Sequence, residues 1–328
     1  GLVLLALVLG LATGPSMMAP SDVLAILLAG PSADGVPLAD RVIVWHIRLP
    51  RVLLGALVGA SLACVGAMMQ GLFRNPLADP GLVGVSAGAA LAAVSVIVLS
   101  GSILAPLAGL LGVYTLPVAS FFGGLAATIL IYRIGTRAGR SSVALMLLAG
   151  IALGAMAGAC TGFLVYLSDD TQLRDLTFWS LGGLSGASWT KLAASAPMML
   201  AALALSPLVA RGLNVVVLGE AEAYHLGIRV QALKRATIFL VALATGAAVA
   251  VAGPIGFVGI VAPHLLRLAI GPDHRTLLPA SALFGAILLV VSDMAARTLV
   301  APAELPIGIL TAAIGAQVFL WILMCRRG

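Results

Sequence analysis

The chain has 328 residues, of which 61% are hydrophobic and 9% are charged, and its mean hydropathy is +1.15. A soluble domain carries about 25% charged residues, so these values exclude a water-soluble globule and also a disordered chain. The remaining class is a protein that crosses a membrane several times. The net charge of +6 then indicates membrane topology rather than nucleic-acid binding, because no basic run is longer than two residues.

Nine stretches are apolar enough to form membrane-spanning helices, which need about 20 mostly apolar residues. In chain order they are 52–70, 81–100, 116–134, 143–167, 192–210, 236–252, 255–270, 277–297 and 306–324. The apolar run Leu2 to Ala12 is interpreted as part of a further helix, and we expect more sequence before Gly1. Gly253-Pro254 separates two of the stretches, because proline breaks or kinks a helix. The sequence therefore predicts one all-α membrane domain over 1–328, with about ten transmembrane helices.

Arg and Lys are divided unevenly between the two sides of this topology. Twelve of the 18 lie on the side of the two termini, and six lie on the other side. Because Arg and Lys gather in cytoplasmic loops, both termini are predicted to be cytoplasmic.

Glycines at four-residue spacing mark one predicted helix. They are Gly150, Gly154, Gly158 and Gly162, and the spacing recurs at Gly55/Gly59 and Gly84/Gly88. Small residues at this spacing let helices approach closely, so the stripe predicts tight helix packing. Lining of a transport pathway is the alternative.

The sequence carries no pattern typical of a catalytic or metal site. It has no phosphate-binding loop motif and no paired-cysteine spacing. The main ionisable residue inside an apolar span is Asp293, with Arg297 four residues later, and this pair can neutralise itself. We therefore expect no catalytic residue, no metal and no bound cofactor, and we expect that energy comes from outside the chain.

Two polar segments are the candidates for contacts with partners. Arg48, Arg51 and Arg297 lie on the predicted non-cytoplasmic side, where they could dock an acidic protein or anchor to lipid headgroups. The longest cytoplasmic interruption is 211–235, in which 220–226 has helix-forming residues between Gly219 and Gly227. A short helix outside the membrane can transmit force from a soluble partner, and a plain amphipathic connector is the alternative.

The chain carries six distinctive motifs: Arg48-Leu49-Pro50-Arg51, Met69-Gln70-Gly71-Leu72-Phe73-Arg74-Asn75-Pro76-Leu77-Ala78-Asp79-Pro80-Gly81, Gly253-Pro254-Ile255-Gly256-Phe257-Val258-Gly259, Pro263-His264, Asp273-His274-Arg275 and Glu304-Leu305-Pro306-Ile307-Gly308. With these motifs, the chain resembles the permease subunits of binding-protein-dependent ABC importers for iron chelates, haem and vitamin B12. The resemblance runs over nearly the whole length. Together these motifs are highly specific.

The resemblance implies a vitamin B12 permease-like fold in the bacterial inner membrane. It also implies a homodimer with a path at its interface, two separate ATPase subunits that hydrolyse ATP, and a periplasmic binding protein. The implied binding-protein docking residues are Arg48, Arg51 and Arg297, and the implied ATPase-coupling residues are Leu218, Gly219, Glu220, Ala223, Leu226 and Gly227. The implied cytoplasmic gate is Asn75 and Leu77 with Val143 and Ala144 opposite, although the family can carry small polar residues at the last two positions.

The segment from Asp169 to Gly183 is most similar to haem permeases, so haem ranks first, a ferric siderophore second and cobalamin third. His46 is the one histidine predicted to face outward, beside Trp45, and it is the candidate for substrate contact; a solvated interfacial histidine is the alternative. Two other classes remain as hypotheses. An ion-coupled secondary carrier requires acidic residues inside the membrane, and a membrane-embedded enzyme requires a nucleophile–base pair.

Overall fold

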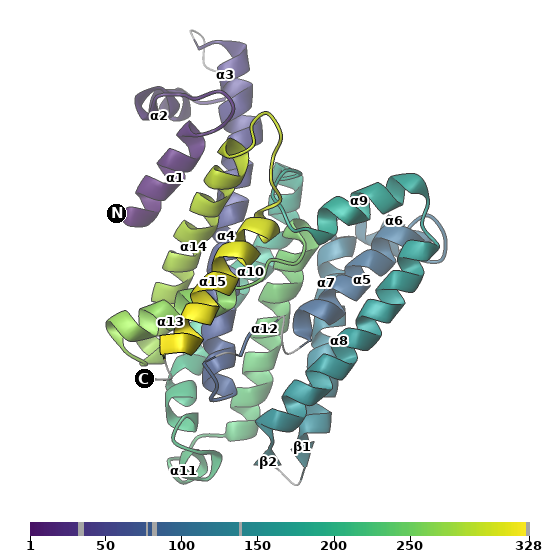
Figure 1. Cartoon of the computed structure of the whole chain (residues 1–328), viewed down its shortest axis with the longest axis vertical. Helices are drawn as coiled ribbons and strands as arrows, with labels where there is room; N and C mark the ends of the chain where they lie inside the picture. The colour runs from purple at the N-terminus through teal and green to yellow at the C-terminus, as the bar shows by residue number, and fades with distance from the viewer. Residues whose placement is uncertain (32–35, 77, 81–83, 138–139, 326–328) are drawn as a thin grey trace.

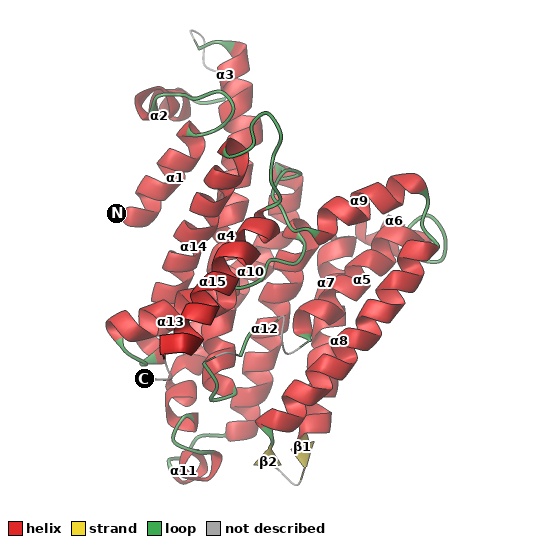
Figure 2. Cartoon of the chain, in the orientation of Figure 1, coloured by secondary structure: helices red, strands yellow, loops and turns green. Residues whose placement is uncertain are grey.

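The computed structural model describes the chain except residues 32–35, 77, 81–83, 138–139 and 326–328. The described residues form a bundle of helices with one small antiparallel hairpin (Figures 1 and 2). The main helices are α1 (Leu2–Ala12), α4 (Leu49–Leu72), α5 (Val85–Leu99), α7 (Thr115–Gly135), α8 (Val143–Tyr166), α10 (Trp189–Val216), α12 (Val230–Ala252), α13 (Val258–Ile270), α14 (His274–Thr298) and α15 (Ile307–Cys325). The shorter elements are α2 (Pro20–Ala29), α3 (Leu38–Val42), η1 (Ile43–Arg48), α6 (Ala105–Leu111), η2 (Gly112–Tyr114), α9 (Asp170–Ser180), α11 (Glu220–His225), β1 (Thr136–Arg137) and β2 (Arg140–Ser141).

The all-α membrane class predicted from the sequence is confirmed, and every predicted span coincides with a helix. Six helices of the described chain are long and apolar enough to cross a membrane. By contrast, α1 has 11 residues and α13 has 13. At about 1.5 Å per residue neither reaches the roughly 30 Å of a hydrocarbon core. The total of ten transmembrane helices therefore stays a prediction.

Polar side chains cap the first turns of several helices. The Ser142 hydroxyl accepts the Leu145 N–H at the start of α8, and Asp273 accepts the Arg275 N–H at the start of α14. Asp169 and Gln172 form a capping box at α9. These contacts satisfy backbone donors that lack partners within the helix. At the C-terminal end of α12, Gly253 has a φ of +67° and is followed by Pro254, so the helix break predicted there is confirmed.

The centre of the bundle is α4, which packs against α14, α13, α10 and α12. Its contacts with α14 and α13 include places where the two backbones approach directly. A Cβ on Gly59 would lie 2.2 Å from the Gly285 carbonyl oxygen, and one on Gly66 would lie 1.9 Å from that of Gly259. Only glycine permits helices to approach this closely, so these positions set the distances between α4 and its neighbours.

A second group of helices, α5, α7 and α8, packs beside this centre (Figure 1), and α12 contacts both groups. Gly88 and Gly123 bring α5 against α7 in the same backbone-to-backbone manner. The glycine stripe on α8 is different. A Cβ on Gly154, Gly158 or Gly162 would meet nothing within 4 Å in the described chain. The prediction that this stripe packs tightly is therefore wrong at these three positions within the subunit, because α8 turns that face away from the bundle.

The functional candidates fall at opposite ends of the bundle (Figure 1). The helices α2 and α3 lie at one end, which we call the α3 end. The helix α11 and the hairpin of β1 and β2 lie at the other, which we call the α11 end. Because α4 runs between these ends, it can connect events at one with events at the other.

Candidate transport sites at the two ends of the bundle

At the α3 end, three arginines and two carboxylates form one cluster. Arg51, in the first turn of α4, places Nη2 2.9 Å from Oδ1 of Asp293 and Nη1 2.9 Å from Oε2 of Glu304. Arg297 Nε lies 3.0 Å from Oδ2 of the same aspartate, which confirms the predicted pairing of Asp293 with Arg297. The Asp293 side chain is 2% exposed. One buried carboxylate therefore forms ion pairs with two guanidinium groups.

The same arginines hold the end of α1. Arg297 donates to the carbonyls of Gly10 and Thr13, each at 3.0 Å, while Arg48 Nη1 donates to that of Leu11 at 2.7 Å. Arg48 also donates to the backbone and hydroxyl oxygens of Ser16. The last carbonyls of a helix have no partner within it and carry partial negative charge, so guanidinium groups are suited to this position.

These contacts change the expectation of an exposed positive face. Arg48, Arg51 and Arg297 are 3%, 6% and 3% exposed, because carboxylates and carbonyls of the same chain surround them. The guanidinium groups are therefore not free surface charges in this structure. Their role in docking a binding protein stays a prediction.

His46 is exposed in η1, near the start of α4. Its neighbour Trp45 is fixed from both sides: its indole N–H donates to the Ile26 carbonyl, and its own carbonyl accepts from Trp189 at 2.9 Å. The structure thus holds the backbone of His46 while leaving the ring accessible. Contact of this ring with substrate stays a prediction.

At the α11 end, α4 stops in a tight turn next to the predicted gate. The N–H of Arg74 donates to the Gly71 carbonyl at 3.3 Å, and the N–H of Asn75 donates to that of Gln70 at 3.1 Å. This pair of bonds is a Schellman motif, with Arg74 in the left-handed position at a φ of +50°. A residue other than glycine is strained there by about 1 kcal/mol, so the surrounding contacts hold the turn in place.

The predicted gate residues are only partly described. Asn75 is half-buried in the turn after α4, and Ala144 is exposed in the first turn of α8. Leu77 lies outside the described residues, as does the side chain of Val143. Phe73, two residues before Asn75, and Met146, two residues after Ala144, belong to one buried apolar cluster. The structure thus brings the neighbours of the predicted gate residues together.

A hollow of about 620 Å³ adjoins Asn75 at this end. Asp273 and Asn214 lie on its wall. The backbone N–H of Arg275 and the amide of Asn214 donate to the Asp273 carboxylate, and these bonds hold the pKa of Asp273 below its usual value. The carboxylate thus stays charged at neutral pH and caps α14 beside the hollow.

The predicted coupling segment separates into an outer and an inner face. Leu218 and Leu226 are 67% and 63% exposed, whereas Ala223 is fully buried against Val216 and Val230. Gly219 and Gly227 flank α11 with φ of +138° and +80°, and Glu220 pairs with Lys234 at 2.7 Å. Tyr224, between the two leucines in the chain, is 74% exposed and is absent from the predicted coupling residues. An aromatic side chain in a short segment bounded by two glycines was the available signal.

Comparison with known proteins gives the family. A profile described as the FecCD transport family matches residues 2–325. The chain belongs to this family. It is a membrane permease of the ABC importer class, because that is the role of the family.

Named relatives differ in the substrates that they carry. The hemin transport system permease protein HmuU of Yersinia pestis is 50% identical over 86% of this chain and 84% of that protein. The cobalamin import system permease protein BtuC of Halobacterium salinarum is 44% identical over 94% of this chain and 80% of its own length. Among solved structures, an inward-facing metal-chelate type ABC transporter matches with a TM-score of 0.81 and 30% identity, over 98% of this chain and 96% of that one.

Proposed function

We propose that this FecCD permease imports haem through a homodimer driven by two ATPase subunits. Substrate is delivered by a periplasmic binding protein at the α3 end, and both termini lie in the cytoplasm of a bacterial cell. A ferric siderophore ranks second and cobalamin third. The ranking is supported by the 50% identity to a hemin permease, against 44% to a cobalamin permease.

The observation that carries the transport path is the uncovered face of α8. Only 22% of the most apolar stretch of α8 is buried by the rest of the chain, compared with 78% of that stretch in the span that contains α4. Its glycines Gly154, Gly158 and Gly162 lie on open space. A second subunit could pack closely against this face, because its glycines have no side chains. This supports a path between two subunits.

A path of this kind suits a bulky chelate. Among the described residues, no group of three or more His, Cys, Asp or Glu is placed to hold a metal ion. Near α8, the amphipathic helix α9 leaves Phe178 and Leu173 exposed. Apolar contacts without fixed ligands would let haem, a flat and largely apolar ring, leave as readily as it enters.

Uptake into liposomes tests this proposal. The liposomes contain the permease and its ATPase, with ATP inside and the binding protein outside, and haem, a ferric siderophore and cobalamin are offered separately. Accumulation of haem that requires ATP supports the proposal. Accumulation of another chelate alone overturns the ranking, and accumulation driven by an ion gradient without ATP overturns the mechanism.

We expect Leu226→Asp to weaken the binding of the ATPase. Leu218, Tyr224 and Leu226 are exposed in or beside the short helix α11. A buried apolar anchor contributes about 2 kcal/mol to an interface, or roughly a 30-fold change in Kd. The matched control is Leu38→Asp, because Leu38 is 68% exposed at the α3 end. Co-purification and titration of the ATPase measure the effect, and equal affinity for both variants contradicts the coupling role.

A further inference from the structure

We propose that Lys234 is a positioning residue, which transmits movement of α11 to the turn after α4 through its ion pair with Glu220. The inference rests on the proposed function, in which an ATPase moves α11. It adds a specific connection between the coupling segment and the predicted gate.

The ion pair joins α11 to the interior of the bundle. Glu220 is the first residue of α11, and its Oε2 lies 2.7 Å from Nζ of Lys234, in the second turn of α12. The Lys234 side chain is 4% exposed and that of Glu220 is 24% exposed. A buried ammonium group is strongly disfavoured without a nearby negative charge, so displacement of Glu220 favours a matching movement of Lys234.

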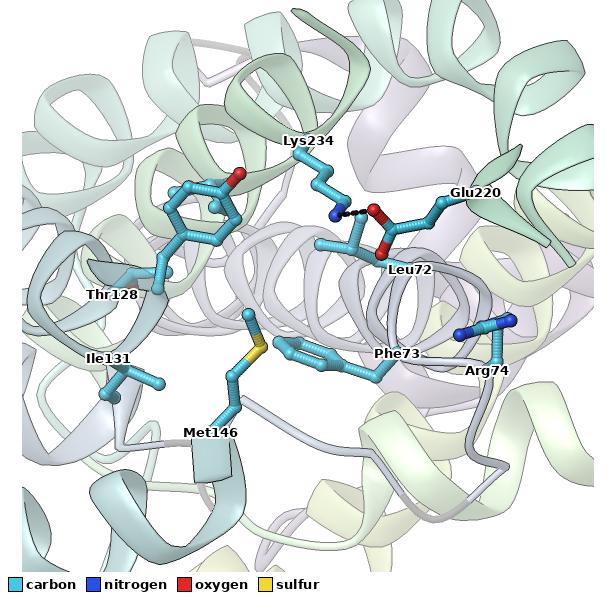
Figure 3. Close-up of a pocket in the computed structure, with 10 residues that line it drawn as sticks. Leu72, Phe73, Arg74, Thr128, Ile131, Met146, Glu220 and Lys234 are labelled. Atoms are coloured by element: carbon cyan, nitrogen blue, oxygen red, sulfur yellow. Dashed lines mark ion pairs between the residues drawn. The ribbon is translucent and has the colours of Figure 1, made fainter. Parts of the chain in front are cut away.

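Around this pair, residues of five helices, α4, α7, α8, α11 and α12, line one small cavity (Figure 3). Lys234 and Glu220 form one side, Phe73 and Arg74 extend from the end of α4, and Met146 enters from α8. The Tyr132 ring of α7 lies 6.0 Å from the lysine Nζ, within range of a cation–π contact.

The cavity has a volume of only about 20 Å³. That is room for about one water molecule, so the side chains are otherwise in close contact. A packed interior cannot absorb a shift of a charged side chain without moving its neighbours. Movement of Lys234 is therefore transferred to Phe73 and Met146, which are 7% and 3% exposed and flank the predicted gate residues.

The turn that receives this movement is strained. Arg74 lines the same cavity, and its φ of +50° is held by the Schellman bonds and by its neighbours. Strain of this kind gathers in segments that switch between conformations. A small change in packing at Phe73 then suffices to alter the turn that carries Asn75.

The alternative is that the ion pair only anchors α11 and stabilises the subunit. Both roles predict that removing a single charge is harmful, because the other charge is left buried. The double variant Lys234→Met with Glu220→Gln separates them, since it leaves neither charge unpaired and keeps the side-chain volumes similar. Lys234→Arg retains the charge, and Arg235→Met removes an equal charge from the exposed next position of α12.

The experiment measures haem uptake and ATP hydrolysis together in liposomes that contain the whole transporter with its binding protein. Uptake by the wild-type protein tests the proposed function, so failure of that function is recognised before any variant is compared. Where the double variant assembles, we expect uptake per hydrolysed ATP to fall by about fivefold or more, the lower range of coupling between sites. Lys234→Arg retains the charge and should keep the wild-type ratio of uptake to ATP hydrolysis. Arg235→Met should also leave this ratio unchanged.

A wild-type uptake-to-ATP ratio in the assembled double variant overturns the proposal. If that variant does not assemble, Glu220→Gln alone replaces it, because the amide keeps a hydrogen-bond acceptor and loses only the charge. The expected ratio is then reduced by about threefold or more, which is within the range measured for exposed ion pairs. An unchanged ratio in Glu220→Gln equally overturns the connection.

Discussion

Asp293→Asn is expected to destabilise the subunit severely. The substitution keeps the shape of the side chain but removes the negative charge that Arg51 and Arg297 share, at distances of 2.9 and 3.0 Å. The two buried guanidinium groups would then share no carboxylate, and Glu304 would remain paired with Arg51 alone. Removing one partner from a buried ion pair costs about 3–5 kcal/mol, which is a large part of the stability of most domains.

The chain offers a matched control for this prediction. Glu304→Gln makes the same change from carboxylate to amide at a side chain that is 34% exposed and pairs only with Arg51 among the ion pairs of the described residues. A pair at that exposure contributes about 1 kcal/mol or less, so the effect should be much smaller. Thermal unfolding in mild detergent, followed by size-exclusion chromatography, measures both. Equal loss of stability in the two variants would show that burial of Asp293 does not set the cost.

A double variant examines the cause further. Arg51→Met added to Asp293→Asn removes one of the two cations that Asp293 neutralises, and Arg297 keeps its bonds to the carbonyls of Gly10 and Thr13. We expect part of the lost stability to return, because the penalty arises from uncompensated charge. No recovery would indicate that the loss comes from packing instead.

The second large effect is expected at the crossing of α4 and α14. In Gly285→Leu the new Cβ would lie 2.3 Å from the Gly59 carbonyl oxygen and 2.4 Å from Cβ of Ala63. Neither atom belongs to a flexible side chain, so the helices themselves must separate. Overpacking typically costs about 1–3 kcal/mol, and we expect the upper end or more because this contact centres the bundle.

Gly158→Leu is the matched control, because its Cβ meets nothing within 4 Å in the described chain. The subunit should fold with wild-type thermal stability, whereas association of two copies should be lost if α8 forms the dimer interface. Gly285→Leu should instead lower the yield of folded, monodisperse subunit at every protein concentration, because the defect lies within the subunit. A stable Gly285→Leu subunit would contradict the close crossing of α4 and α14.

Of the two ion pairs that Asp293 makes with arginines, one was predictable from the sequence and the other was not. Asp293 and Arg297 are four residues apart on one helix, so their pairing follows from helical geometry and was predictable. Arg51 is 242 residues from Asp293, and no local pattern relates them. The arginines were therefore interpreted as surface charges, whereas folding brings them among carbonyls and carboxylates that bury them.

The glycines show the same division. Their spacing indicates a face suited to close approach, but it does not say what approaches that face. At Gly59 the partner is Gly285 of the same chain, while at Gly158 the chain supplies none. Only the packing of α8 on α5 and α7 decided which face remained uncovered.

By itself, the sequence determined the membrane class, the helical segments and the short helix predicted at 220–226, because hydropathy and periodicity act over short stretches of chain. The motifs also indicated the permease family. The tertiary structure alone decided that the three arginines are buried, that Lys234 of α12 pairs with Glu220 of α11, and that α8 is exposed. Those results depend on contacts between residues far apart in the chain, which local physical chemistry does not specify.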